Sequence, residues 1–254
     1  MLRTKYDYYD PDSSSWTWNN FYYPVYSQYS YWAQKFPANL SERNKALYYS
    51  DGNILIRGDT VFNFMRSNGK YYVNNNILSE DELKQFQKFH HSILNFSLFP
   101  SNGMQQAKCA GRRGDRLDVF LYEVDQIISN NQWHNSSIKN YCQRYSNGAT
   151  LESIKSFFMS FADINSFFRA FYFPTEDIVL SQHVDSLLEK FLDNGRRYSN
   201  WRTDITWDNV CNRKSYLKIA IDFWILRKHF LEDVLSINVE ELDDGLDIEN
   251  YFHL

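Results

Sequence analysis

Four basic residues lie close together in the stretch KCAGRRGDRLD: Lys108, Arg112, Arg113 and Arg116. Gly111 and Gly114 in this turn would let the backbone approach a ligand closely. A predicted helix follows, and the free N–H groups at a helix start bind phosphate or carboxylate groups together with arginine side chains. The stretch is therefore a candidate anion site. The structural alternative is that these side chains form internal ion pairs with nearby aspartates.

Aspartates supply a second kind of chemistry, because carboxylate oxygens are the ligands that magnesium prefers. The candidates are Asp10, Asp12, Asp115 and Asp118. Each has a structural alternative: a turn at residues 10 to 13, a helix cap at Asp115, and an ion pair with an arginine at Asp118. No cofactor is evident otherwise, and we expect magnesium only if the protein is an enzyme.

His90 and His91, followed by Asn95, have the order of residue types found in HNH nucleases. In such a site one histidine activates water and others hold a metal. The sequence shows no further metal-binding His or Asp at close range, and short motifs of this kind match many unrelated chains. The alternative is that one histidine faces the core and the other faces water.

The elements that must position these residues are predicted to be helical for the most part. In the first half we expect a helix at residues 41–50, a strand at 53–58, and a helix from about Ser79 to His91. The last of these opens with a capping box, Ser79 and Glu82. SILNFSLFP then indicates a buried strand that Pro100 ends, because proline cannot donate to a sheet.

The second half carries apolar residues at spacings of three and four, which is typical of amphipathic helices. We expect a helix over 116–129 capped by Asp115 and one over 151–171 capped by Thr150. Two more follow, one that begins near Pro174 and is closed by Gly195, and one over 214–235. The predicted fold is mainly α, a single domain over residues 1–254 with a small strand element in its first half.

Both ends of the chain have unusual compositions. Residues 6 to 36 hold 13 aromatic side chains, so we expect the segment 1–40 to pack on the body of the protein or on a partner. Residues 238–254 hold six acidic residues and no Lys or Arg. Such blocks are commonly solvated, and folding over a basic patch is the alternative.

Several of these motifs occur in a fixed order: YYDPDSSS, SDGNILIRGD, SILNFSLFP and GDRLDVFLYEV. The order resembles that of a family of bacterial proteins of unknown function, which has D-x-D-S, a strand H-x-x-G-x-x-x-x-F-P, an asparagine-and-basic turn, and a helix D-R-x-D-x-x-L. The corresponding positions are His90 or His91, Phe99-Pro100, Asn102, Lys108 and Asp115-Arg116-x-Asp118. Leu94-Asn95 departs from the pattern, which has glycine there. The resemblance implies a helical soluble protein, gives no activity, and points again to Asp10, Asp12, Arg116 and Asp118.

Composition and motifs narrow the function classes. The chain is 43% hydrophobic, 18% aromatic and has a net charge of −4. It lacks the glycine-rich phosphate loops, the G-x-S-x-G elbow, the H-E-x-x-H zinc motif and the EF-hand loop. Its three cysteines are widely spaced, so we expect them to be reduced in a cytoplasmic protein. No run of 18 apolar residues occurs, so we expect the protein to be soluble and not to interact with a membrane.

Two functions remain open. The first is a non-catalytic binding protein that acts in phage–bacterium conflict. It would bind a protein partner through its aromatic and charged surfaces. The second is a phosphate-handling or nucleic-acid-processing enzyme. In that case the arginines would clamp phosphate, the aspartates would hold a divalent metal, and a nucleic acid would be the partner. The enzyme requires the aspartates to converge beside the arginines in one cleft.

Overall fold

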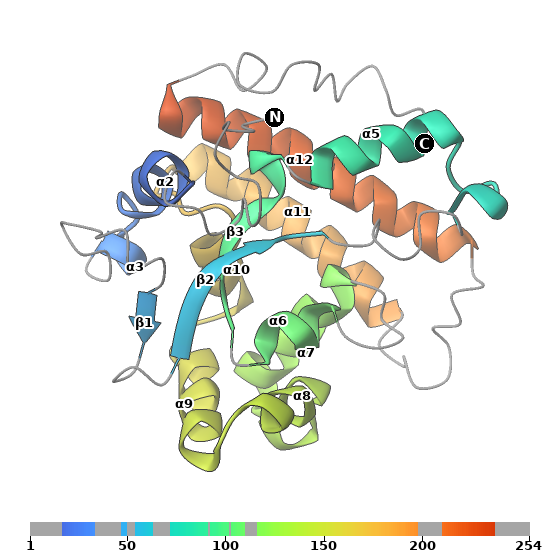
Figure 1. Cartoon of the computed structure of the whole chain (residues 1–254). Coiled ribbons are helices and arrows are strands. Elements are labelled where there is room, and N and C mark those ends of the chain that lie inside the picture. Colours follow the sequence, from blue (N-terminus) through green and yellow to red (C-terminus); the bar gives the residue numbers. More distant parts are fainter. Residues whose placement is uncertain are drawn as a thin grey trace.

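Helices make up most of the computed structural model, and a small sheet lies among them (Figure 1). The fold is therefore mainly α with a strand element in the first half, as the sequence predicts. The structure describes residues 17–33, 47–49, 54–62, 72–90, 92–101, 103–109, 116–197 and 210–236.

The sheet is antiparallel, in the order β1 (Leu47–Tyr49), β2 (Ile54–Thr60) and β3 (Phe96–Pro100). Ile56 pairs with Leu47 on one side and with Pro100 on the other. Every residue of β3 is buried, which explains why its apolar residues do not alternate strictly with polar ones. The prediction of a helix over residues 41–50 is wrong at Leu47–Tyr49, because pairing with β2 overrides the local helical pattern.

The first half also contains short helical segments, one of which has the predicted cap. Ser79 and Glu82 form the capping box: the Glu82 amide donates to Ser79 Oγ (3.2 Å) and the Ser79 amide to Glu82 Oε2 (2.7 Å). It opens the predicted helix, α5 (Glu80–His90). The other segments are η2 (Trp18–Tyr22), α2 (Tyr23–Tyr26), α3 (Ser30–Ala33), η3 (Ile93–Asn95) and α6 (Met104–Cys109).

The long helix predicted over residues 151–171 is two helices, α9 (Gly148–Met159) and α10 (Ile164–Tyr172). The apolar stripe continues through both, but Asp163 restarts the helix with a reciprocal cap to Ser166. The predicted cap at Thr150 is also wrong: Asn147 caps α9, and it accepts a hydrogen bond from the Thr150 amide (2.9 Å). Before them come α7 (Leu117–Asn130), η5 (Gln132–Asn135) and α8 (Ser137–Tyr145).

The last two helices, α11 (Ile178–Arg197) and α12 (Val210–Leu235), run side by side in opposite directions (Figure 1). The sequence predicts that Gly195 closes this helix, but Gly195 lies inside α11. A Cβ there would come within 2.2 Å of the carbonyl oxygen of Asp118. Glycine is therefore present because it lets α11 approach the backbone of α7 closely.

One cluster of buried apolar side chains joins all these parts, and much of it is aromatic. The described part of the amino-terminal aromatic segment belongs to it: Trp18, Phe21, Tyr22, Tyr26 and Trp32 are 0 to 2% exposed. Tyr26 and Trp32 also donate hydrogen bonds to the carbonyl oxygens of Phe171 (2.6 Å) and Ala170 (2.6 Å). None of the described helices is both long enough and apolar enough to cross a bilayer.

Candidate functional site

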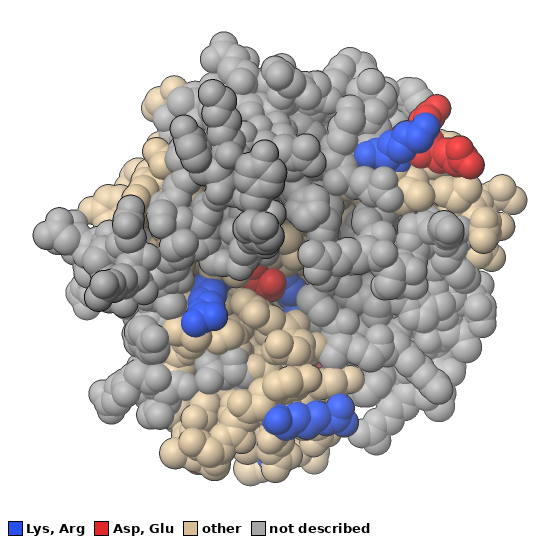
Figure 2. Space-filling view, in the orientation of Figure 1, with Lys and Arg blue, Asp and Glu red and all other residues tan. Residues whose placement is uncertain are grey.

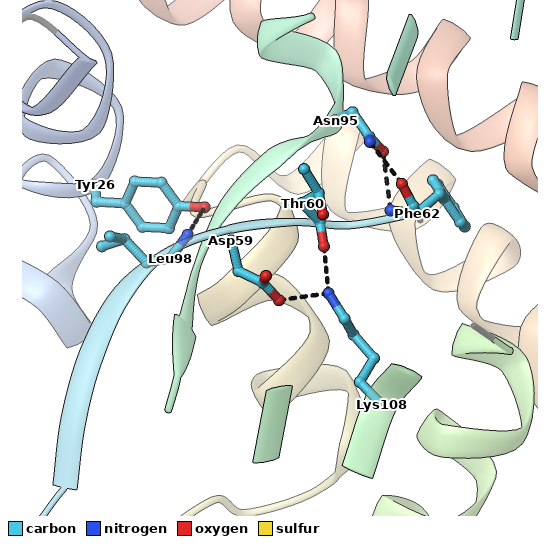
Figure 3. Close-up of polar contacts among 7 residues, drawn as sticks. All are labelled: Tyr26, Asp59, Thr60, Phe62, Asn95, Leu98 and Lys108. Carbon is cyan, nitrogen blue, oxygen red and sulfur yellow. Dashed lines mark hydrogen bonds and ion pairs between the residues drawn. The ribbon is translucent and has the colours of Figure 1, made fainter. Parts of the chain in front are cut away.

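Lys108 lies inside the protein in an ion pair. The turn after β3 directs α6 back along β2, and Lys108 Nζ then donates to Asp59 Oδ2 (2.6 Å) and to the carbonyl oxygen of Thr60 (Figure 3). It also lies 5.1 Å from the centre of the Phe99 ring. The lysine side chain is 0% exposed and that of Asp59 is 17% exposed. Lys108 is therefore held by protein groups and presents no charge to the surface.

Arg116 is in a second buried pair. Its Nε and Nη2 donate to the two carboxylate oxygens of Asp118 (2.8 and 2.6 Å), and Asn194 Nδ2 of α11 donates to the same carboxylate (2.6 Å). The guanidinium also lies 4.9 Å from the centre of the Tyr216 ring. Burial alone would lower the pKa of Arg116, but the Asp118 carboxylate more than offsets this, so the pKa stands above its ordinary value. This network ties α7, α11 and α12 together.

The start of α7 is arranged differently from the prediction. Arg116 occupies the cap position without a side-chain cap, and the Leu117 amide donates to the hydroxyl of Tyr216 (2.9 Å). A residue 99 positions away thus satisfies one of the free amides at the helix start. Asp115, predicted to cap this helix, lies outside the described residues, as do Arg112 and Arg113.

Asn95, the described member of the nuclease-like trio, is buried and used by the fold. Its Oδ1 accepts from the Phe62 amide (2.9 Å), and its Nδ2 donates to the Phe62 carbonyl (2.8 Å) (Figure 3). The same Oδ1 also accepts from Trp224 Nε1 (3.3 Å). These bonds hold the chain that leaves β2 against η3. His91 and the side chain of His90 lie outside the described residues.

Of the four predicted magnesium ligands, only Asp118 lies in the part of the chain that the structure describes. Within those residues no group of three or more His, Cys, Asp and Glu side chains is placed to hold a metal ion. Asp118 is committed to Arg116 and Asn194, while Asp10 and Asp12 lie outside the described residues, together with Asp115. On the face of the molecule that Figure 2 shows, the described Lys and Arg side chains lie apart from one another and form no continuous basic surface.

Sequence reasoning missed a third buried cation, Arg227 of α12. It is 0% exposed, and its Nη2 donates to the carbonyl oxygen of Phe96 (3.0 Å). Three aromatic rings surround its guanidinium carbon, with centres 5.3 to 5.8 Å away: Phe21, Phe173 and Phe230. Burial lowers its pKa, and the nearby Tyr26 opposes that shift. Within the described residues no carboxylate pairs with it, so it is held by rings and a carbonyl group.

The described surface has one apolar feature that the sequence reasoning also missed. Ile178 and Val179, adjacent at the start of α11, are 76% and 65% exposed. The other large apolar side chains exposed in the described residues, Tyr23, Tyr145 and Met159, are far apart in the sequence. A signal exists: α11 buries Val184, Leu188 and Phe191, whereas Val179 falls on the same face as the exposed residues His183, Ser186 and Lys190. An apolar residue on a polar face is the pattern to search for.

A groove of about 520 Å³ lies beside these two residues. It is formed where the carboxyl end of α12 and the start of α11 meet the turn after α2, and Figure 1 shows these ends on one side of the molecule. Its floor and walls come from Gln28, Thr175, Asp177, Val179, Leu180, His183, Asp233 and Val234. The groove therefore combines an apolar strip with two carboxylates.

Hydrogen bonds fix the segments that form the groove. Asp177 Oδ1 accepts from the Leu180 amide (2.7 Å) and so caps α11. The Ser30 amide at the start of α3 donates to Glu176 Oε1 (3.2 Å), which joins the amino-terminal segment to the start of α11. Arg169 of α10 donates through Nε and Nη2 to Asp185. Ile178 and Val179 are thus exposed on a helix start that is well anchored.

Comparison with known proteins found no matching family model, no similar curated protein and no similar solved structure.

Proposed function

We propose that this chain is a non-catalytic binding protein that recognises another protein through the apolar surface at the start of α11. The observation that carries the proposal is the exposure of Ile178 and Val179 beside the groove. The exposure of two adjacent branched side chains to water is unfavourable, because burying each of them would lower the free energy by about 1.5 to 3 kcal/mol. Contact with a partner recovers that free energy.

The charged residues support the same choice. In the enzyme hypothesis Arg116 would clamp phosphate together with Arg112 and Arg113, which lie outside the described residues. Arg116 is buried and paired with an aspartate, and so is Lys108, the fourth candidate for anion binding. The described aromatic residues of the amino-terminal segment are mostly buried, so they do not supply the recognition surface either. We therefore assign recognition to α11.

Site-specific photocrosslinking tests this proposal. A photoreactive phenylalanine analogue replaces Val179 in one variant and Glu152, an exposed residue of α9, in another. In cells that express the chain, the Val179 variant should give a discrete protein adduct that the Glu152 variant lacks. Adding Ile178→Ser to the Val179 variant should weaken the adduct. Equal labelling from both positions, or labelling from neither, would show that this surface is not the binding site.

A further inference from the structure

We infer that the groove beside α11 selects a partner segment in which Lys or Arg lies next to apolar side chains; this inference rests on the proposed function. The groove places apolar atoms of Val179, Leu180 and Val234 next to the carboxylates of Asp177 and Asp233. An apolar strip alone would accept many sequences. The carboxylates restrict the choice, because they attract a cation and repel acidic segments.

The two carboxylates are available for this role. Asp177 uses Oδ1 to cap α11, which leaves Oδ2 for a ligand, and Asp233 is exposed. Neither forms an ion pair with any residue that the structure describes. Two basic side chains of the adjacent helices are engaged with other carboxylates: Arg169 pairs with Asp185, and Lys190 pairs with Asp222. The groove therefore keeps a negative charge that a bound cation would neutralise.

His183 is the one other titratable residue in the groove lining. The groove has the dimensions for a short segment, since about 520 Å³ holds a few side chains.

Peptide display tests the inference and requires no identified partner. A random 12-residue peptide library is selected against the full chain and against the Asp177→Asn/Asp233→Asn variant. Asparagine keeps the acceptor that caps α11, so the variant removes charge and preserves the helix start. The matched control, Glu152→Gln/Glu189→Gln, removes two exposed carboxylates outside the groove lining.

We expect the full chain to select peptides with Lys or Arg beside apolar residues. The best peptide, synthesised and measured by fluorescence anisotropy, should bind the Asp177→Asn/Asp233→Asn variant about 10-fold more weakly, and the control variant with unchanged affinity. Higher salt should narrow the difference, because these charges are exposed. Ile178→Ser/Val179→Ser should weaken binding further.

The outcomes separate this inference from the proposed function. Apolar peptides without a basic residue, lost on Ile178→Ser/Val179→Ser but not on the aspartate changes, would overturn the charge selection and leave the proposed function intact. A Val179 photoadduct together with no enriched peptide would have the same meaning. Self-association of the full chain that Ile178→Ser abolishes would identify a second copy as the occupant, and so overturn the inference.

Discussion

At the scale of single residues, the protein holds three buried cations in three different ways. Lys108 has a carboxylate and a carbonyl group, Arg116 has a bidentate carboxylate, and Arg227 has aromatic rings and one carbonyl group. A buried charge without such partners would cost several kcal/mol, so each set of partners is part of the fold. Lys108 and Arg116, which lie at the two ends of the basic turn, therefore stabilise the fold.

The Lys108–Asp59 pair gives a prediction about stability. Lys108→Met leaves the Asp59 carboxylate without its cation, and Asp59→Asn leaves a charged lysine that is 0% exposed. We expect each change to lower the free energy of unfolding by about 3 kcal/mol, and the double variant to lose less than the sum. Urea unfolding measures all three.

Lys84→Met is the control for this pair, because Lys84 and Asp81 form an exposed ion pair. It should leave the unfolding midpoint unchanged. Strictly additive losses for Lys108 and Asp59 would contradict the coupling that the structure shows.

At the scale of elements, the sequence predicts those helices and strands that have a local signal, and it does not predict those that depend on residues far away in the chain. The capping box at Ser79 and Glu82 is complete within four residues, and it predicts α5 correctly. Leu47–Tyr49 has no such local signal, because its strand exists through pairing with β2. Gly195 looks like a helix end in the sequence, and only the position of Asp118 shows why it is needed inside α11.

The candidate site follows the same division. Residue types alone drew attention to Lys108 and Arg116, and they also raised ion pairing as an alternative. They did not reveal that the partner of Lys108 is Asp59, 49 positions earlier, or that Asn194 joins Asp118. The sequence does not point to Arg227, because the aromatic rings that contact its guanidinium come from distant parts of the chain.

Gly195 supplies the prediction at this scale. Alanine favours a helix by about 1 kcal/mol over glycine. At this position, however, its Cβ would lie 2.2 Å from the carbonyl oxygen and 2.8 Å from the carbonyl carbon of Asp118. Since backbone atoms cannot move aside easily, we expect Gly195→Ala to lower the free energy of unfolding by about 1 to 3 kcal/mol.

Gly148→Ala is the matched substitution, because no atom lies within 4 Å of the added Cβ. Its thermal midpoint should equal or exceed that of the unchanged protein. If Gly195→Ala is as stable as Gly148→Ala, the close approach of α7 and α11 described here is wrong.

At the scale of the whole molecule, a shared aromatic core makes distant segments depend on one another. The Trp32 ring lies edge to face with Phe171 at 5.5 Å, and Phe173 meets Phe223 of α12 at 5.1 Å. Such contacts link the amino-terminal segment to α12 through α10 and the residue that follows it. Groups buried in this core report on the folded state as a whole.

Alkaline pH should therefore weaken the fold. Burial raises the pKa of the Cys142 thiol from 9.0 to about 12, and burial also raises the pKa of the Tyr26 hydroxyl above its ordinary value. The unfolded chain releases these protons at lower pH than the folded chain does. The free energy of unfolding should thus be independent of Cys142 well below pH 9. It should then fall as the pH rises from about 9 towards 12, by up to about 1.4 kcal/mol per pH unit from this group.

Urea unfolding at pH 7 and at several values between 9 and 11 measures this dependence. Cys142→Ala removes the thiol, so its free energy of unfolding should fall less steeply over that range, although a small cavity lowers it at every pH. Identical slopes for the two proteins would show that Cys142 ionises as readily in the folded chain as in the unfolded one.

The hydrogen bonds of Tyr26 and Trp32 have a consequence for synthesis on the ribosome. Their acceptors, Phe171 and Ala170, lie 145 and 138 residues later in the chain. At about 5 to 20 residues per second, the amino-terminal aromatic side chains leave the ribosome roughly 7 to 30 seconds before α10 leaves it. During that interval they have no completed core to enter, so the nascent chain should depend on chaperones until its second half emerges.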